Sequence, residues 1–381
     1  RIAHRNTGKL IEDQAGQDVM LRVGNDENLH YLFYRDLATA ALEVDPSSMM
    51  IGIERAVRNF AMPGTGIENF DALAKEIAKA GIYDFKIHHE QILVPVVLSR
   101  ATGKATRCYE VETSFYRDLR DALDVAAPQC YFVERDEATD DFLLLLEDFA
   151  PCRQGDQIAG CALDEAEACV DELVRLHGPL WNSPFLATLP WLNRSTDSDR
   201  SGSQALMQQV FPGFLARYAD RLNPQARRVG EEFVRDSGNY FRRTLPHRSV
   251  VHGDFRLDNL LFRAAGGVGV VDFQTVTHAC APQDVAYFIG AGLETEARRT
   301  HERALVGRWT EGLRSYGVQL TTDDAWLEYR RYTFAGFVMA VVASMIVKQT
   351  PRGDEMFLAM ANRHGVHAAD LNSLSAVRGQ A

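Results

Sequence analysis

The stretch that most constrains this chain of 381 residues runs from residue 250 to residue 274 and reads VVHGDFRLDNLLFRAAGGVGVVDFQ. Two short apolar runs, 260–262 and 268–271, are predicted to be strands, and the glycines between them permit a tight reversal. Such a hairpin brings Asn259, just before the first strand, close to Asp272, just after the second. The pattern therefore predicts two oxygen-bearing side chains at one end of a hairpin, with Asp254 a few residues upstream.

These three side chains are of the types that phosphoryl transfer requires. Moving a phosphoryl group from a nucleotide to a hydroxyl needs a carboxylate that accepts the hydroxyl proton, and hard oxygen ligands that hold Mg²⁺ on the phosphates. Asp254 is the candidate for the first role, and Asn259 and Asp272 are the candidates for the second. Either aspartate alone is more simply an ordinary turn or strand-end carboxylate. The ordered set of three favours the functional interpretation.

The same order of residues resembles the protein-kinase signature, H-R-D-L-x-x-x-N followed by D-F-G. Its counterparts are residues 252–254 (His-Gly-Asp), Asn259 and residues 272–274 (Asp-Phe-Gln). Gly253 and Gln274, in place of Arg and Gly, resemble instead the small-molecule branch of the fold, the aminoglycoside phosphotransferase and choline kinase group. Within that group the chain looks most like the ecdysteroid-kinase-like subfamily.

The resemblance implies an α+β, protein-kinase-like bilobal fold, with a small sheet-containing N-lobe and a larger, mainly helical C-lobe. It covers about residues 82–350. The implied division is an N-terminal segment of uncertain role at 1–80, partly helical, an N-lobe at 81–150 with a hinge at its end, and a C-lobe at 151–381 that carries the catalytic loop.

Further site residues follow from the resemblance. Arg256 lies two residues after Asp254, where kinases often keep a lysine beside the transferred phosphate, and a guanidinium could bind that phosphate bidentately. Kinase-like folds also pair a strand lysine with a helix glutamate, so that the lysine reaches the α and β phosphates. Glu112, in a predicted helix at 110–123, matches that glutamate. Lys86, in a short predicted strand, is the best candidate for its partner, although an exposed strand lysine is an equal alternative.

The run at 143–149 resembles the strand that leads into the hinge where adenine docks. Its backbone, at Glu147 and Phe149 in particular, is expected to make those contacts. A glycine turn at 63–66 could cover nucleotide phosphates, but G-x-G alone is a weak signal.

Residues outside the motif give a second set of expectations. Asp284 resembles the family aspartate that hydrogen-bonds the catalytic loop, although a plain helix cap is also possible. Residues 322–348 show one long helical pattern, and the last dozen residues look frayed. The aromatic residues of the C-lobe would suit a bulky apolar alcohol, yet core packing explains them at least as well. The aromatic residues in question are Trp181, Trp191, Phe211 and Phe214.

Composition excludes some function classes. A net charge of −11 argues against a nucleic-acid partner and leaves weak room for a cationic substrate. Six cysteines without a CxxC pair favour reduced thiols and a cytoplasmic location. We expect neither a signal peptide nor a membrane span, because the start lacks an apolar run and the most apolar stretch, 334–347, is too short.

The sequence thus predicts an enzyme that uses ATP and Mg²⁺ to move the γ-phosphate to a hydroxyl of a small molecule. The alternative is a nucleotide-binding pseudokinase that acts as a ligand- or partner-binding module. Protein kinase activity is disfavoured because no Ala-Pro-Glu element follows Asp272.

Overall fold

The computed structural model describes residues 7–23, 76–77, 79–80, 106–137, 140–193, 197–242, 246–264, 266–347 and 349–379. The chain divides into two compact units, Arg1–Thr102 and Gly103–Ala381. In the first unit, residues 7–10 and 14–23 are helical. Lys86 and the glycine turn at 63–66 lie outside the described residues. The boundaries expected at 80 and 150 stay predictions.

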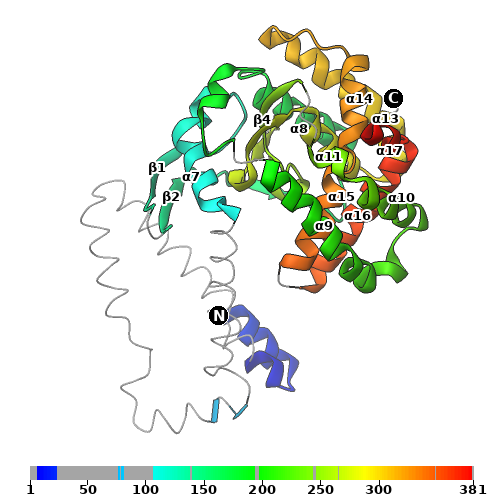
Figure 1. The fold of residues 1–381 in the computed structure, drawn as a ribbon. Helices are drawn as coiled ribbons and strands as arrows, with labels where there is room; N and C mark the ends of the chain where they lie inside the picture. The colour runs from blue at the N-terminus through cyan, green and yellow to red at the C-terminus, as the bar shows by residue number, and fades with distance from the viewer. Residues whose placement is uncertain are drawn as a thin grey trace. The chain divides into compact units, whose positions relative to one another are not determined.

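The second unit begins with the predicted helix, α7 (Cys108–Asp118), followed by an antiparallel strand pair. The strands of this pair are β1 (Cys130–Arg135) and β2 (Phe142–Leu146), and β2 lies within the run at 143–149 and the residue before it. In Figure 1 they lie beside α7 at one side of the unit. Helix α7 buries Val111 and Phe115 on one face, and this apolar stripe is what holds it in place.

The predicted hairpin is confirmed. Strands β5 (Leu260–Arg263) and β6 (Val268–Val270) pair antiparallel with Leu260 opposite Val270, and β3 (Cys152–Gln154) adds to the outer side of β5. A further antiparallel pair joins β4 (Arg248–Val251) to β7 (Thr277–Cys280). The chain between β4 and β7 therefore holds the whole predicted catalytic stretch.

The rest of the described second unit is helical. Its helices are α8 (Leu163–His177), α9 (Asp197–Tyr218), α10 (Pro224–Asp236), α11 (Gly238–Arg242), α12 (Pro282–Gly292), α13 (Thr295–Leu313), α14 (Thr322–Tyr332), α15 (Ala335–Ile346), α16 (Pro351–Asp370) and α17 (Ser373–Arg378). One apolar core joins α7, α8, α12, α13 and the sheets, and a second joins α9, α10, α15 and α16. Small antiparallel sheets in a mainly helical unit confirm the predicted α+β class.

Two expectations about the C-terminal region are wrong. The pattern at 322–348 is not one helix, because α14 ends at Tyr332 and α15 begins at Ala335; between them, the Phe334 ring stacks on Phe233 at 4.1 Å. The last residues are not frayed either. Helix α17 buries Leu374 and Val377 against α10 and α14, so tertiary packing orders a segment whose local pattern is weak.

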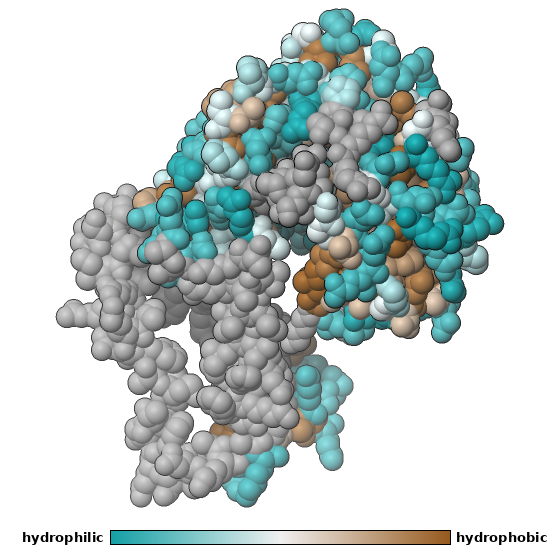
Figure 2. All heavy atoms as spheres, viewed as in Figure 1, coloured by the Kyte–Doolittle hydropathy of each residue, from teal (hydrophilic) through white to brown (hydrophobic). Residues whose placement is uncertain are grey.

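No helix among the described residues is long and apolar enough to cross a membrane. The apolar run at 334–347 contains α15, a helix with one face buried in the second core. In Figure 2, hydrophobic residues gather on the visible surface near α9, α15 and α16, whereas most of the remaining coloured surface of this unit is hydrophilic. Ile346, at the end of α15, is 50% exposed.

A buried carboxylate fixes the loop after β4. Asp284, in the first turn of α12, accepts hydrogen bonds from the backbone N–H groups of His252 at 2.6 Å and Gly253 at 2.9 Å. His177 at the end of α8 lies 3.3 Å from the same carboxylate, and its other ring nitrogen accepts from the indole N–H of Trp309. The helix N-cap is Ala281, so Asp284 is the loop anchor that the family resemblance implied and not a helix cap.

We predict that Asp284→Ala lowers the free energy of unfolding by about 3 kcal/mol, because the buried His252 N–H and the partly buried Gly253 N–H lose their acceptor. Asp164→Ala is the matched control, since Asp164 lies exposed in the first turn of α8 and should cost less than about 1 kcal/mol. Urea unfolding of both variants measures the difference. Equal losses would show that Asp284 does not anchor the loop.

Candidate active site

The loop between β4 and β5 needs glycine at one position. Gly253 has a φ of +82°, and a Cβ there would lie 3.0 Å from the carbonyl oxygen of Thr275. The Thr275 hydroxyl in turn donates to the carbonyl of His252 at 2.7 Å. The His-Gly pair therefore turns the chain tightly against the segment after Asp272 and delivers Asp254 to its position.

Asp254 is the best-connected polar side chain of the site. Its Oδ1 accepts a 2.5 Å hydrogen bond from the Tyr287 hydroxyl, and its Oδ2 accepts from the Nε of Arg256 at 3.0 Å. The side-chain amide of Asn259 donates to the same Oδ2 and to the Asp254 carbonyl. The residue is 9% exposed, so its carboxylate is fixed in one orientation and only its edge reaches solvent.

Arg256 is held by carboxylates. Besides Asp254, its guanidinium donates to Asp258 Oδ2 at 2.7 Å, and Arg352 from α16 donates to the same Asp258 carboxylate. Salt-bridge and hydrogen-bond partners such as these lower the pKa of Asp258, although burial opposes the shift. Arg256 therefore lies beside the candidate base, as the sequence predicts, but it is bound to side chains rather than free.

Asp272 follows β6 in a conformation that is uncommon for a non-glycine residue. Its φ of 68° and ψ of 60° lie in the left-handed region, which is typical of functional sites held by their surroundings. The hairpin register brings the backbone carbonyl of Asn259 within 3.1 Å of the Val271 N–H. Asn259 and Asp272 thus lie at the same end of the hairpin, as predicted.

Helix α7 brings a third carboxylate to this place. Burial is the main cause that raises the pKa of Glu112 to about 7, and the charge of Asp272 adds to it, while the backbone N–H of Phe273 opposes it. Burial likewise raises the pKa of Asp272, and the neighbouring Asp254 contributes. The ring of Phe115 stacks on Phe273 at 3.9 Å and 7°, which fixes the helix against the Asp272 turn.

This donor set fits a divalent cation. Carboxylate and amide oxygens are hard ligands, and the mutual repulsion of the three acids would be relieved by positive charge between them. Among the described residues there is no group of three or more His, Cys, Asp or Glu side chains placed to hold a metal, so a site here would need the Asn259 amide as well.

The residues expected to form the hinge lie after β2. The Glu147 N–H donates to the carbonyl of Gln129 at 2.8 Å. The ring of Phe149 covers Gly269, where a Cβ would lie 2.5 Å from it, and the Arg263 guanidinium stacks over the same ring at 4.3 Å. The Phe149 side chain therefore packs this segment against β6.

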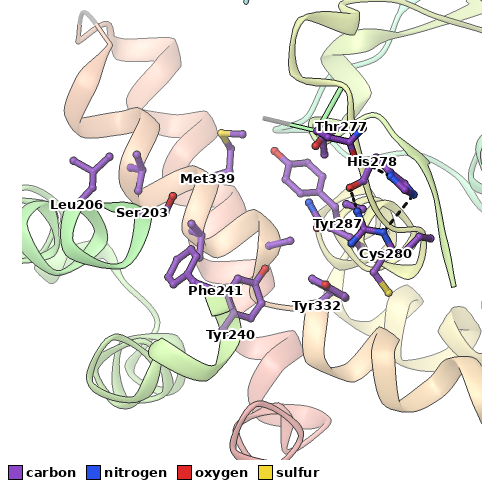
Figure 3. A pocket seen from close by; sticks show the side chains of 18 residues that line it. Ser203, Leu206, Tyr240, Phe241, Thr277, His278, Cys280, Tyr287, Tyr332 and Met339 are labelled. Carbon is purple, nitrogen blue, oxygen red and sulfur yellow. Dashed lines mark hydrogen bonds between the residues drawn. The ribbon is translucent and has the colours of Figure 1, made fainter. Parts of the chain in front are cut away.

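A pocket of about 500 Å³ lies next to the loop and was not predicted. Its walls include Tyr287 and three aromatic residues on neighbouring helices, Tyr240, Phe241 and Tyr332 (Figure 3). The sequence held one indication of this pocket. Tyr287 lies three residues after Asp284, so both side chains lie on the same face of the helix, toward the loop. The aromatic residues noted in the sequence lie elsewhere, since Phe211 and Phe214 belong to the second core and Trp191 and Trp181 pack in or against the first.

His278 lines this pocket as a neutral ring. Arg248 Nε donates to its Nε2 at 3.3 Å, and its Nδ1 lies 2.9 Å from the Asn193 side-chain oxygen. Burial and the Arg248 charge lower its pKa to about 4 from 6.5. A proton on Nδ1 and a lone pair on Nε2 satisfy both contacts.

We predict a pH-dependent contribution of His278 to stability. The unfolded chain takes up a proton on this ring below about pH 6.5, whereas the folded chain does so only near pH 4, so stability is lost as the pH falls between these values. His278→Gln should therefore lose less unfolding free energy than the wild type over that range. Urea titrations at several pH values measure this, and parallel losses would contradict it.

Comparison with known families matches two different models to the chain. Residues 83–318 match the model of the phosphotransferase enzyme family, and residues 1–108 match that of the fatty acid desaturases. The two matches overlap at 83–108.

A curated relative of the N-terminal part is the putative acyl-[acyl-carrier-protein] desaturase DesA1 of Mycobacterium tuberculosis. It is 38% identical over 125 residues, which are 32% of this chain and 35% of the relative. The chain thus spans about a third of the length of that protein.

Solved structures of similar chains include the GDP complex of wild-type aminoglycoside 2'-phosphotransferase-IIIa (12% identity, TM-score 0.45, covering 68% of this chain and 83% of that one). Another is a choline/ethanolamine kinase family protein from Mesorhizobium loti (15% identity, TM-score 0.44, covering 71% of this chain and 83% of that one). A third is an ethanolamine kinase from Plasmodium vivax (11% identity, TM-score 0.46, covering 72% of this chain and 74% of that one). Family membership does not depend on these distant structures. Because the matched residues 83–318 make up more than half of the 381, the chain belongs to the phosphotransferase enzyme family.

Proposed function

We propose that this protein is an ATP-dependent small-molecule kinase that transfers the γ-phosphate to an alcohol. The observation that carries the proposal is the clustering of Asp254 with Arg256 and Asn259, beside Asp272 at the end of the hairpin. A module that only binds a nucleotide has no need of a fixed carboxylate in the position of a general base.

Asp254 is the proposed base. It orients the acceptor hydroxyl and takes its proton while the hydroxyl oxygen forms a bond to the γ-phosphorus. The bond between that phosphorus and the β-phosphate bridging oxygen breaks, and ADP leaves. The hydrogen bond from Tyr287 holds the carboxylate in position for this transfer.

The remaining residues act on the nucleotide. Asn259 and Asp272 would hold Mg²⁺, which supplies positive charge for the phosphates when bound. Arg256 would exchange a carboxylate partner for the γ-phosphate. Lys86 with Glu112 would bind the other phosphates, and the backbone of Glu147 and Phe149 would receive the adenine.

Replacing the base and the metal ligand should have different effects. Saturation with Mg²⁺·ATP at about 100 times its Kd should stabilise the wild type by roughly 2.7 kcal/mol. Asp272→Asn should lose that stabilisation, whereas Asp254→Asn should keep it and lose about 10²–10⁴-fold in phosphate transfer. Thermal unfolding and release of ADP measure the two effects.

Asp121→Asn is the control, because the Asp121 side chain is 96% exposed and lies outside the site. It should match the wild type in both measurements. Undiminished transfer by Asp254→Asn would refute the proposal.

A second candidate, a nucleotide-binding module without transfer, is favoured by one observation. Residues 83–318 contain only two lysines, Lys86 and Lys104. Among the described residues, the influences on the pKa of Glu112 are burial, Asp272 and the Phe273 N–H, and none is a cation. If neither lysine pairs with Glu112, the α and β phosphates lack a lysine.

The two lysines decide between the candidates. If the protein is an active kinase, Lys86→Met or Lys104→Met should reduce phosphate transfer sharply, while the other variant leaves it unchanged and serves as the control. The same assay of ADP release applies. Nucleotide binding without measurable transfer in the wild type, unaffected by either substitution, would establish the binding module.

Composition and the motif support further proposals. All six cysteines are free, which suits the reducing cytoplasm. The acidic net charge makes a nucleic-acid partner unfavourable. The ecdysteroid-kinase-like subfamily remains a prediction from the motif.

A further inference from the structure

The pocket beside the catalytic loop is lined by two residues next to the proposed base. Gly253 of the loop lines it, and so does Tyr287, whose hydroxyl donates to Asp254 Oδ1 at 2.5 Å. Its volume of about 500 Å³ lies within the range of roughly 300–1,000 Å³ that is usual for small-molecule sites. A compound held there would reach Asp254 by passing the tyrosine.

Much of the pocket wall is apolar. Helices α9, α11 and α15 form one side, and β7 with α12 forms the other (Figure 3). The apolar side chains on the helical side are Leu206, Phe241, Val338, Met339 and Val342. A ligand that contacts this wall gains binding free energy only if it has an apolar part whose surface is removed from water there.

The charge of the lining excludes one class of ligand. Among the described residues that line the pocket there is no carboxylate, and Arg248 is the only permanently charged side chain. His278 beside it is neutral at pH 7. Although aromatic rings can bind cations, the Tyr240 ring already faces the Arg331 guanidinium at 5.9 Å. A buried cationic ligand would therefore lack a counter-charge here.

We infer that this pocket binds the acceptor alcohol, and that the acceptor is a hydroxylated compound with an apolar body and no cationic group. That the bound alcohol is the acceptor rests on the proposed function, whereas the preference of the pocket for a neutral, apolar compound does not depend on it. A polycationic sugar or a quaternary ammonium alcohol fits these walls poorly. The hydroxyl of the bound compound lies toward Tyr287 and Asp254, and its apolar part lies along α15.

Binding is tested on the full chain without nucleotide, by calorimetry, with phenylbutanol as the neutral probe and phenylpropyl trimethylammonium as the cationic probe of similar size. The substitutions are Met339→Glu and Met339→Lys, because Met339 is half-buried and lies on the apolar wall. Ile346→Glu is the matched control, since Ile346 lies on the same helix, is 50% exposed and does not line the pocket.

The wild type and Ile346→Glu should bind phenylbutanol alike and more tightly than the cation. Both Met339 variants should bind the alcohol at least about tenfold more weakly, because a charge replaces an apolar wall. Met339→Glu should bind the cation more tightly than Met339→Lys does. Thermal unfolding of each variant shows that it is folded.

Tighter binding of the cation by the wild type would overturn the inference, and so would alcohol binding that none of the Met339 variants changes. A parallel assay with Mg²⁺·ATP asks whether bound phenylbutanol is phosphorylated. Binding that depends on Met339 without phosphorylation supports the pocket chemistry and counts against the kinase, so the two failures are distinguishable.

Discussion

The two hydrogen bonds that the Asp284 carboxylate accepts from the His252 and Gly253 N–H groups hold the site together. His252 is buried and Gly253 is partly buried, in a loop that has no strand partner, so an internal acceptor replaces water. The loop is thereby fixed to α12, the helix that also supplies Tyr287. Helix α12 therefore positions the candidate base through Asp284 and orients it through Tyr287. The same helix forms part of the pocket wall.

The site concentrates negative charge. Asp254, Asp272 and Glu112 come from the loop, the hairpin end and α7, and the pKa values of Asp272 and Glu112 are raised by burial and by a neighbouring acid. Arg256 offsets part of this charge through Asp254. A metal with bound nucleotide phosphates would complete the balance, since the cation meets the carboxylates and the arginine can turn to the anion. In this arrangement the carboxylates would face the cation and Arg256 would face the phosphates.

Much of the site could be predicted from local sequence, because its spacing is local. The hairpin at 260–270 and the helix that carries Glu112 depend on strand and helix periodicity, which a single sequence displays. The pocket could not be predicted, because its walls come from segments more than a hundred residues apart, such as Leu206 and Val342. Helix α17 was missed for the same reason. Its order comes from contacts with α10 and α14, including the Arg331 guanidinium on its carbonyls.

The stacked rings of Phe115 and Phe273 have a mechanical consequence. The rings lie 3.9 Å apart and nearly parallel, and Phe273 follows Asp272 directly in the chain. Helix α7 cannot slide or tilt without either opening a gap between two buried rings or moving the turn at Asp272. The residues that precede Cys108, where the desaturase match ends, are covalently joined to that helix. A force applied to the chain at this junction would therefore be transmitted to the aspartate at the centre of the site through the contacts that Phe115, Tyr116 and Glu112 make with the Asp272 turn.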